Sequence, residues 1–249
     1  MQVVLNDKIV SYMSQGKGES ILILHGWGDN SNNWQPFAND LAENYLVITV
    51  DLPGFGNSDT PPEPWGLSDY ARFVGSFLNK IGITPTYIIG HSNGGAIAIR
   101  AIAQQILSPE KLILIASAGI RNEYNGRTKA LRVLTKGGKF LSTPLPTSIK
   151  KHLRQKVYTS IGSEMLVVEH MQQTFKKIVE DDVREDASQL EVPVLLVYGD
   201  EDQQTPLRYA QIFHELIIGS DLEVIAGGDH FIYKDRHNEV MRAVKGFIA

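Results

Sequence analysis

The chain has 249 residues, 43% of them hydrophobic and 21% charged, which predicts one globular domain with a large core, or one domain that carries an insertion. It contains no cysteine, and this excludes disulfide frameworks, thiolate metal sites and cysteine nucleophiles. The formal charge of −4 hides an asymmetry, because residues 121–156 carry a charge of about +9 and the rest of the chain about −13.

The N-terminal stretch "MQVVLNDKIV" has no basic region followed by an apolar one, so it does not resemble a secretory signal. No apolar run approaches the length of a membrane span. We therefore expect a cytoplasmic protein without stable membrane insertion. The sequence carries no signal of oligomeric state.

Apolar runs alternate with helix-length segments along most of the chain. Six runs are rich in β-branched residues and read as buried strands, near 20–26, 45–51, 86–91, 111–117, 192–200 and 221–227. Helices are expected between and after them, near 33–43, 67–82, 93–106, 205–218 and 236–248. This alternation predicts an α/β fold with a mainly parallel sheet flanked by helices. Before the first of these strands, Asn6-Asp7 separates two short β-rich runs and predicts an antiparallel hairpin at the sheet edge.

One segment, residues 120–187, shows no strand pattern. Apolar residues recur at helical spacing in "TSIKKHLRQKVYTSI" and in "EMLVVEHMQQTFKKIVEDD", and a further helix is expected at 128–141. We interpret 120–187 as a helical insertion into a core formed by residues 1–119 and 188–249.

The basic charge of residues 121–156 falls inside this insertion. Its simplest interpretation is a solvated face of the insertion's helices, although it could also steer anionic substrates or lie on an anionic membrane surface. We expect no nucleic-acid partner, because the charge is local and no recognition motif accompanies it.

The segment "YIIGHSNGGAIAIR" places a serine where a strand is expected to end and a helix to begin. Residues 90–94 fit the pattern G-x-S-x-G, which is typical of a sharp strand-to-helix turn with small flanking residues. Such a turn lifts Ser92 to the N-terminus of a helix, where the helix dipole and unpaired N–H groups favour developing negative charge. Ser92 is therefore the candidate nucleophile.

A serine nucleophile needs a base and a group that orients the base. Among the seven histidines, His230 follows the strand expected at 221–227, at the edge where α/β sheets place their sites, and it is the candidate base. The His91 side chain is expected to point away from the site. Asp200 and Asp202 both follow the strand at 192–200, so either could be the acid that orients His230.

Five motifs in order, "LHGWG", "DLPGFGNSD", "GHSNGG", "YGDEDQQTP" and "GGDHF", resemble those of the α/β-hydrolase superfamily, and more narrowly its capped single-domain serine hydrolases. The resemblance covers essentially the whole chain. The family's acid loop reads G-x-x-D-x-x-x-P, which aligns Asp202 and not Asp200 with the catalytic acid. The backbone N–H groups of Trp27 and Asn93 correspond to the oxyanion hole. "DLPGFGNSD" corresponds to a loop that supports the oxyanion loop, and residues 120–187 correspond to the cap over the site.

The resemblance implies a serine hydrolase that acts on a small molecule with an ester or related acyl bond, through an acyl-enzyme and without metal or organic cofactor. Relatives that use an aspartate nucleophile are disfavoured by Ser92. Carbon–carbon bond hydrolases and perhydrolases keep the same triad, and some relatives sense small ligands, so these alternatives stay open.

Overall fold

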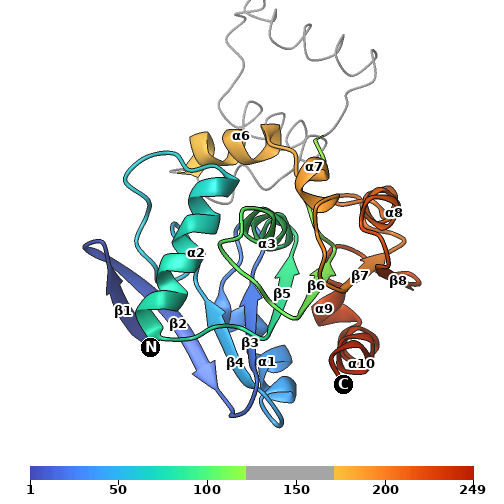
Figure 1. Ribbon diagram of the computed structural model, residues 1–249, viewed down its shortest axis with the longest axis horizontal. Helices are drawn as coiled ribbons and strands as arrows, with labels where there is room; N and C mark the ends of the chain where they lie inside the picture. The colour runs from blue at the N-terminus through green and yellow to red at the C-terminus, as the bar shows by residue number, and fades with distance from the viewer. Residues whose placement is uncertain (122–170) are drawn as a thin grey trace, which may run out of the picture.

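The computed structural model describes residues 1–121 and 171–249 and contains one eight-stranded sheet (Figure 1). Along the sheet the strands follow the order β1-β2-β4-β3-β5-β6-β7-β8. Their bounds are β1 Gln2–Leu5, β2 Lys8–Gln15, β3 Ser20–Leu24, β4 Leu46–Val50, β5 Tyr87–His91, β6 Lys111–Ile115, β7 Val194–Gly199 and β8 Asp221–Ile225. All six strands predicted from apolar runs are confirmed.

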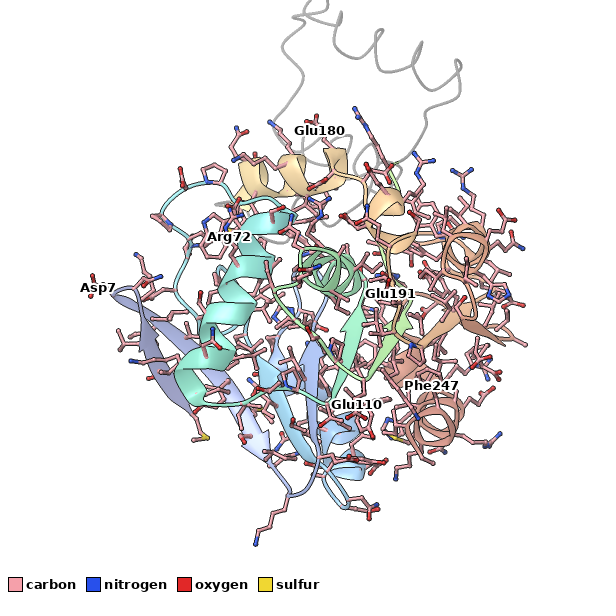
Figure 2. The ribbon with its side chains drawn as sticks, viewed as in Figure 1. Asp7, Arg72, Glu110, Glu180, Glu191 and Phe247 are labelled. Carbon is pink, nitrogen blue, oxygen red and sulfur yellow. The ribbon has the colours of Figure 1, made fainter. Side chains whose placement is uncertain are left out.

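The sheet is antiparallel only at one edge. Strand β1 pairs with β2, and β2 with β4, in antiparallel fashion, whereas every pairing from β4 to β8 is parallel. Asn6 and Asp7 both have positive φ, 50° and 60°, as a tight hairpin turn requires. Figure 2 shows Asp7 at the tip of this hairpin, which confirms the predicted edge hairpin.

Helices cover both faces of the sheet. Helices α2, α3 and α8 pack on one face, and α1 and α10 on the other. The helices of the sheet domain, with a short 3₁₀ turn η1, are η1 Ser31–Trp34, α1 Gln35–Leu41, α2 Leu67–Ile81, α3 Asn93–Ala103, α8 Leu207–Leu216, α9 Ile232–Asp235 and α10 His237–Ile248. Helix α3 ends three residues before the expected position 106, because Gln105 adopts a left-handed conformation with φ of 56°.

The strands are buried on both faces, as their continuous apolar pattern predicts. In β3, Ile21 and Ile23 belong to the core under α1 and α10, while Leu22 and Leu24 belong to the core under α2 and α3. Because the strands from β3 to β8 are parallel, their carboxyl ends share one edge, and the loops that follow β3, β5, β7 and β8 meet there.

Part of the predicted insertion is described. Helix α6 (Gln172–Glu180) and helix α7 (Arg184–Ala187) lie at one end of the molecule, above α2 and α3 in the view of Figure 1. Arg100 on α3 forms ion pairs with Asp181 at 3.0 Å and Asp186 at 2.6 Å, which attach this segment to the core. The helix expected at 128–141 and the basic helix in "TSIKKHLRQKVYTSI" lie outside the described residues.

No helix within residues 1–121 and 171–249 combines the length and the apolar character that crossing a membrane requires.

Candidate active site

Ser92 occupies a strained turn between β5 and α3. Its φ of 50° and ψ of −119° lie outside the regions that L-residues favour, and non-glycine residues persist there only when their surroundings enforce the conformation. The backbone is closely packed at both flanking glycines, since a Cβ on Gly90 would lie 2.6 Å from Cα of Gly95 and one on Gly94 would collide with the carbonyl oxygen of Leu24. The turn therefore requires the small residues that the G-x-S-x-G pattern supplies.

The turn is fixed to the neighbouring strand β6. The backbone N–H of Ser92 donates to the carbonyl of Ile115 at 3.1 Å, and the N–H of Ala118 donates to the carbonyl of Ser92 at 3.0 Å. Ser92 is largely buried at the N-terminus of α3, and its carbonyl accepts the N–H groups of Gly95 at 3.0 Å and Ala96 at 3.4 Å. The N–H groups of the first helical residues, Asn93 and Gly94, precede the point where intrahelical acceptors begin.

Asp202 and His230 form a buried pair. Nδ1 of His230 lies 2.8 Å from Oδ2 of Asp202, and Thr205 donates its hydroxyl to the same oxygen at 2.7 Å. The backbone N–H groups of Gln204 and Thr205 donate to Oδ1 at 2.7 and 2.9 Å. Burial by itself would raise the pKa of Asp202, but the hydrogen bonds from His230 and Thr205 outweigh it and hold the pKa below its ordinary value. Asp202 is thus held as a carboxylate that accepts the Nδ1 proton of His230.

Asp200 has a different environment. Its Oδ1 accepts the backbone N–H of Gly227 at 2.7 Å, a contact between the loops that follow β7 and β8, and its side chain is exposed. The structure thus brings Asp202, and not Asp200, to the ring of His230.

His91 joins the Ser92 turn to the His230 loop. Its Nε2 lies 2.9 Å from the carbonyl oxygen of His230 and therefore donates, and the two rings are 4.9 Å apart between centroids. No hydrogen bond between the Ser92 hydroxyl and the His230 ring is present among the described residues, and such contacts are often long without a bound substrate. The sequence predicted only that His91 turns away from the site. Its contact partner lies 139 residues along the chain, and no local pattern signals it.

The loop after β3 lies against the same turn. A Cβ added to Gly26 would lie 3.1 Å from Cβ of Ser92, so the backbone that leads to Trp27 runs beside the candidate nucleophile. His25 holds this backbone, since its Nδ1 donates to the carbonyl of Gly26 at 2.7 Å and its Nε2 accepts the N–H of Leu52 at 2.9 Å. The Trp27 ring is buried against Phe55 and Phe175.

The "DLPGFGNSD" segment supports the Trp27 loop and the turn that follows it. Leu52 belongs to the segment and bonds His25, as described above. Asp51 accepts the N–H of Ser31 at 2.7 Å through Oδ1 and the N–H of Asn57 at 2.9 Å through Oδ2.

A buried carboxylate that the sequence analysis did not single out connects the Trp27 loop to the segment after His230. Asp29 accepts hydrogen bonds from Nε1 of Trp34 at 3.1 Å and from the hydroxyl of Tyr233 at 2.7 Å, and the rings of Trp34 and Tyr233 stack at 3.9 Å. Burial opposes ionisation of Asp29, yet its hydrogen bonds keep its pKa below the ordinary value. In the sequence Asp29 is marked only by the stretch "GDN" after "HGW", and this stretch is not specific for a buried carboxylate.

No group of three or more His, Cys, Asp or Glu side chains within residues 1–121 and 171–249 is arranged to hold a metal ion.

A sequence profile of the family described as "alpha/beta hydrolase fold" matches residues 19–134. The structure of a bacterial membrane phospholipase A superposes with a TM-score of 0.79 over 100% of this chain and 84% of that chain, at 23% identity. These two findings show that the chain has the α/β-hydrolase fold.

Two relatives match nearly all of this chain. An uncharacterized protein of Mycobacterium tuberculosis is 27% identical over 94% of this chain and 76% of its own length. The pimeloyl-[acyl-carrier protein] methyl ester esterase of Aliivibrio fischeri is 26% identical over 95% of this chain and 96% of its own length.

The buried imidazole of His91 gives the protein a pH-dependent stability. Burial, and next the neighbouring His230, lower the pKa of His91 to about 3. The folded state thus keeps His91 neutral while the unfolded chain protonates it below about pH 6.5, so stability is full above pH 6.5 and is lost as the pH falls. We expect this group to remove about 2 kcal/mol from the free energy of unfolding between pH 6.5 and 4.5.

Urea unfolding across this pH range checks the expectation. His91→Gln keeps a donor for the His230 carbonyl but does not titrate, so its free energy of unfolding should fall less steeply. Equal slopes in the two proteins would show that His91 does not carry the effect.

Proposed function

We propose that the chain is a serine hydrolase that cleaves a carboxylic ester or related acyl bond of a small molecule. The observation that carries this proposal is the buried pair of Asp202 and His230, in which Oδ2 and Nδ1 lie 2.8 Å apart. The carbonyl of His230 also accepts a hydrogen bond from the ring of His91, the residue before Ser92. Nucleophilic acyl transfer needs a serine and a histidine that a carboxylate orients, and these residues follow the ends of parallel strands at one edge of the sheet. The similar methyl ester esterase of Aliivibrio fischeri supports an ester as the bond cleaved.

The mechanism follows from the positions of these groups. His230 removes the proton of Ser92 through Nε2, and Ser92 Oγ attacks the carbonyl carbon of the substrate. Asp202 keeps the Nδ1 proton in place and stabilises the imidazolium that forms. His230 then protonates the leaving alcohol, and water that it activates in turn releases the acyl group from Ser92.

The oxyanion of the tetrahedral intermediate would lie between two backbone N–H groups. Asn93 supplies one from the first turn of α3, and Trp27 supplies the other from the loop after β3. Such donors typically contribute about a hundredfold or more in rate, because they are already oriented before charge develops.

We propose further that residues 120–187 are a cap over this site. The described end of that segment supports the idea, because Phe175 on α6 packs on Trp27 with ring centroids 5.1 Å apart. Thr174 also accepts the backbone N–H of Trp65 in the loop before α2. The described end of the insertion thus contacts Trp27, which would supply one oxyanion donor, and a cap in this position would select the substrate.

Labelling with a fluorophosphonate probe, followed by a panel of p-nitrophenyl esters from acetate to laurate, tests the proposal. The probe should modify Ser92, and at least one ester should be hydrolysed. Ser92→Ala should lose both properties. Ser117→Ala, which removes a neighbouring buried hydroxyl outside the proposed machinery, should keep both. Labelling that survives in Ser92→Ala, or a wild-type protein that hydrolyses none of the esters, would refute an ester hydrolase with this nucleophile.

A further inference from the structure

The side chain of Asn93 is buried without a hydrogen-bond partner. Only 3% of the residue is exposed, and neither Oδ1 nor Nδ2 has a partner among the residues that the structure describes. A buried amide in this state costs stability, and native proteins rarely retain one without a reason. The proposed oxyanion role of Asn93 uses only its backbone N–H, so it does not explain the amide side chain.

The geometry of α3 shows where this amide points. Gly94 and Gly95 face the sheet, since an added Cβ would meet the carbonyls of Leu24 and His25 at Gly94, and Ser117 at Gly95. Successive residues of an α-helix are turned by about 100°, so the Asn93 side chain points away from the sheet. It leaves the first turn of the helix next to Ser92, with Cα atoms about 3.8 Å apart. The amide therefore leaves α3 at the carboxyl edge of the sheet, where Ser92 also lies.

We infer that the Asn93 amide and the N-terminus of α3 form a subsite for a second polar group of the substrate. An amide presents a donor and an acceptor side by side, and a hydroxyl or a carboxamide can satisfy both. Because Asn93 adjoins the nucleophile, that group sits within two or three bonds of the scissile carbonyl. The inference rests on the proposed ester hydrolysis and narrows its substrates to esters with a hydroxyl or carboxamide near the reacting bond.

Paired esters test the subsite. On the acyl side the pair is methyl 2-hydroxybutyrate and methyl butyrate, and on the leaving-group side 2-hydroxyethyl butyrate and propyl butyrate. The measured quantity is the ratio of kcat/KM within each pair, for the wild type and for Asn93→Leu. Intrinsic ester reactivity cancels when the two ratios are compared, and so does any general effect of the substitution on the oxyanion hole.

We expect Asn93→Leu to lower this ratio about tenfold or more for one of the two pairs, because a buried hydroxyl would lose its partner. The pair that responds tells which side of the ester the subsite reads. Asn93→Ala gives the same comparison if the leucine variant does not fold. Unchanged ratios for both pairs in a folded variant would overturn the inference.

Thermal unfolding gives a second readout that does not depend on catalysis. Asn93→Leu should raise the unfolding temperature by about 2–4 °C, because it removes an unpaired buried amide. Thr49→Val is the matched control. Oγ1 of Thr49 is also buried and unpaired. Thr49 lies two residues after Val47 in β4 and shares its face, so it faces α1, on the side of the sheet opposite α3.

Thr49→Val should raise the unfolding temperature and leave both ester ratios unchanged. If the wild type hydrolyses no ester, the proposed function fails and the unfolding temperature alone decides. A lower unfolding temperature for Asn93→Leu would then show that the amide already has a partner, and would overturn the inference.

Discussion

Replacing Asp202 by asparagine is expected to lower kcat for ester hydrolysis by about four orders of magnitude. Asparagine fills the same volume but can turn its NH₂ group toward His230, which favours the tautomer with the proton on Nε2. In that tautomer Nε2 cannot accept the Ser92 proton. The imidazolium that forms during attack also loses its carboxylate partner, which in the unsubstituted protein lies 2.8 Å from Nδ1.

Asp200→Asn is the matched control for this prediction. It makes the same chemical change two residues away, at an exposed carboxylate that bonds the backbone of Gly227. We expect kcat to change by less than about threefold, since such a surface change typically alters stability by only about 0.5 kcal/mol. Steady-state kinetics of both variants on the best p-nitrophenyl ester decides the assignment. A larger loss in Asp200→Asn would show that the acid loop was aligned two residues out of place.

The fold could be predicted from the sequence to a large extent, because each element carries its own local signal. The continuous apolar run "SILIL" can be buried on both faces only in a sheet that helices cover on both sides, and the structure places it there. Asn6 and Asp7 mark their turn because both tolerate positive φ. The end of α3 was less predictable, since the left-handed Gln105 has no such preference.

The site was predictable to the extent that loops follow strands. Ser92, Asp202 and His230 each follow the carboxyl end of a parallel strand, so the topology alone brings them to one edge. The choice between Asp202 and Asp200 needed the resemblance to a family, because both follow the same strand. The structure separates them by burial and by the contacts of Thr205.

The residues that reasoning from sequence missed act through contacts between distant segments. His91 was predicted to point away from the site, but its bond to the His230 carbonyl joins positions 139 residues apart. Asp29 bonds the Tyr233 hydroxyl across 204 residues. Neither contact leaves a periodic or spacing signal, since each depends on how two loops pack after the sheet has formed.

Ser92→Ala and His230→Ala are each expected to lower kcat by about a millionfold, and the double variant is expected to be no slower than either single variant. The reason is that Ser92 is a poor nucleophile unless His230 removes its proton, while His230 has no proton to remove once Ser92 is gone. The two residues thus supply one interaction between them, and removing either removes all of it.

Single-turnover rates for the three variants on one p-nitrophenyl ester test this coupling. The rate that remains should still exceed the uncatalysed rate, because the proposed oxyanion donors, the N–H groups of Trp27 and Asn93, belong to the backbone and neither substitution deletes them. If instead the two losses multiplied in the double variant, Ser92 and His230 would be acting independently. His230 would then not be the base for Ser92, and its bond to Asp202 would serve to hold the loops after β7 and β8 together.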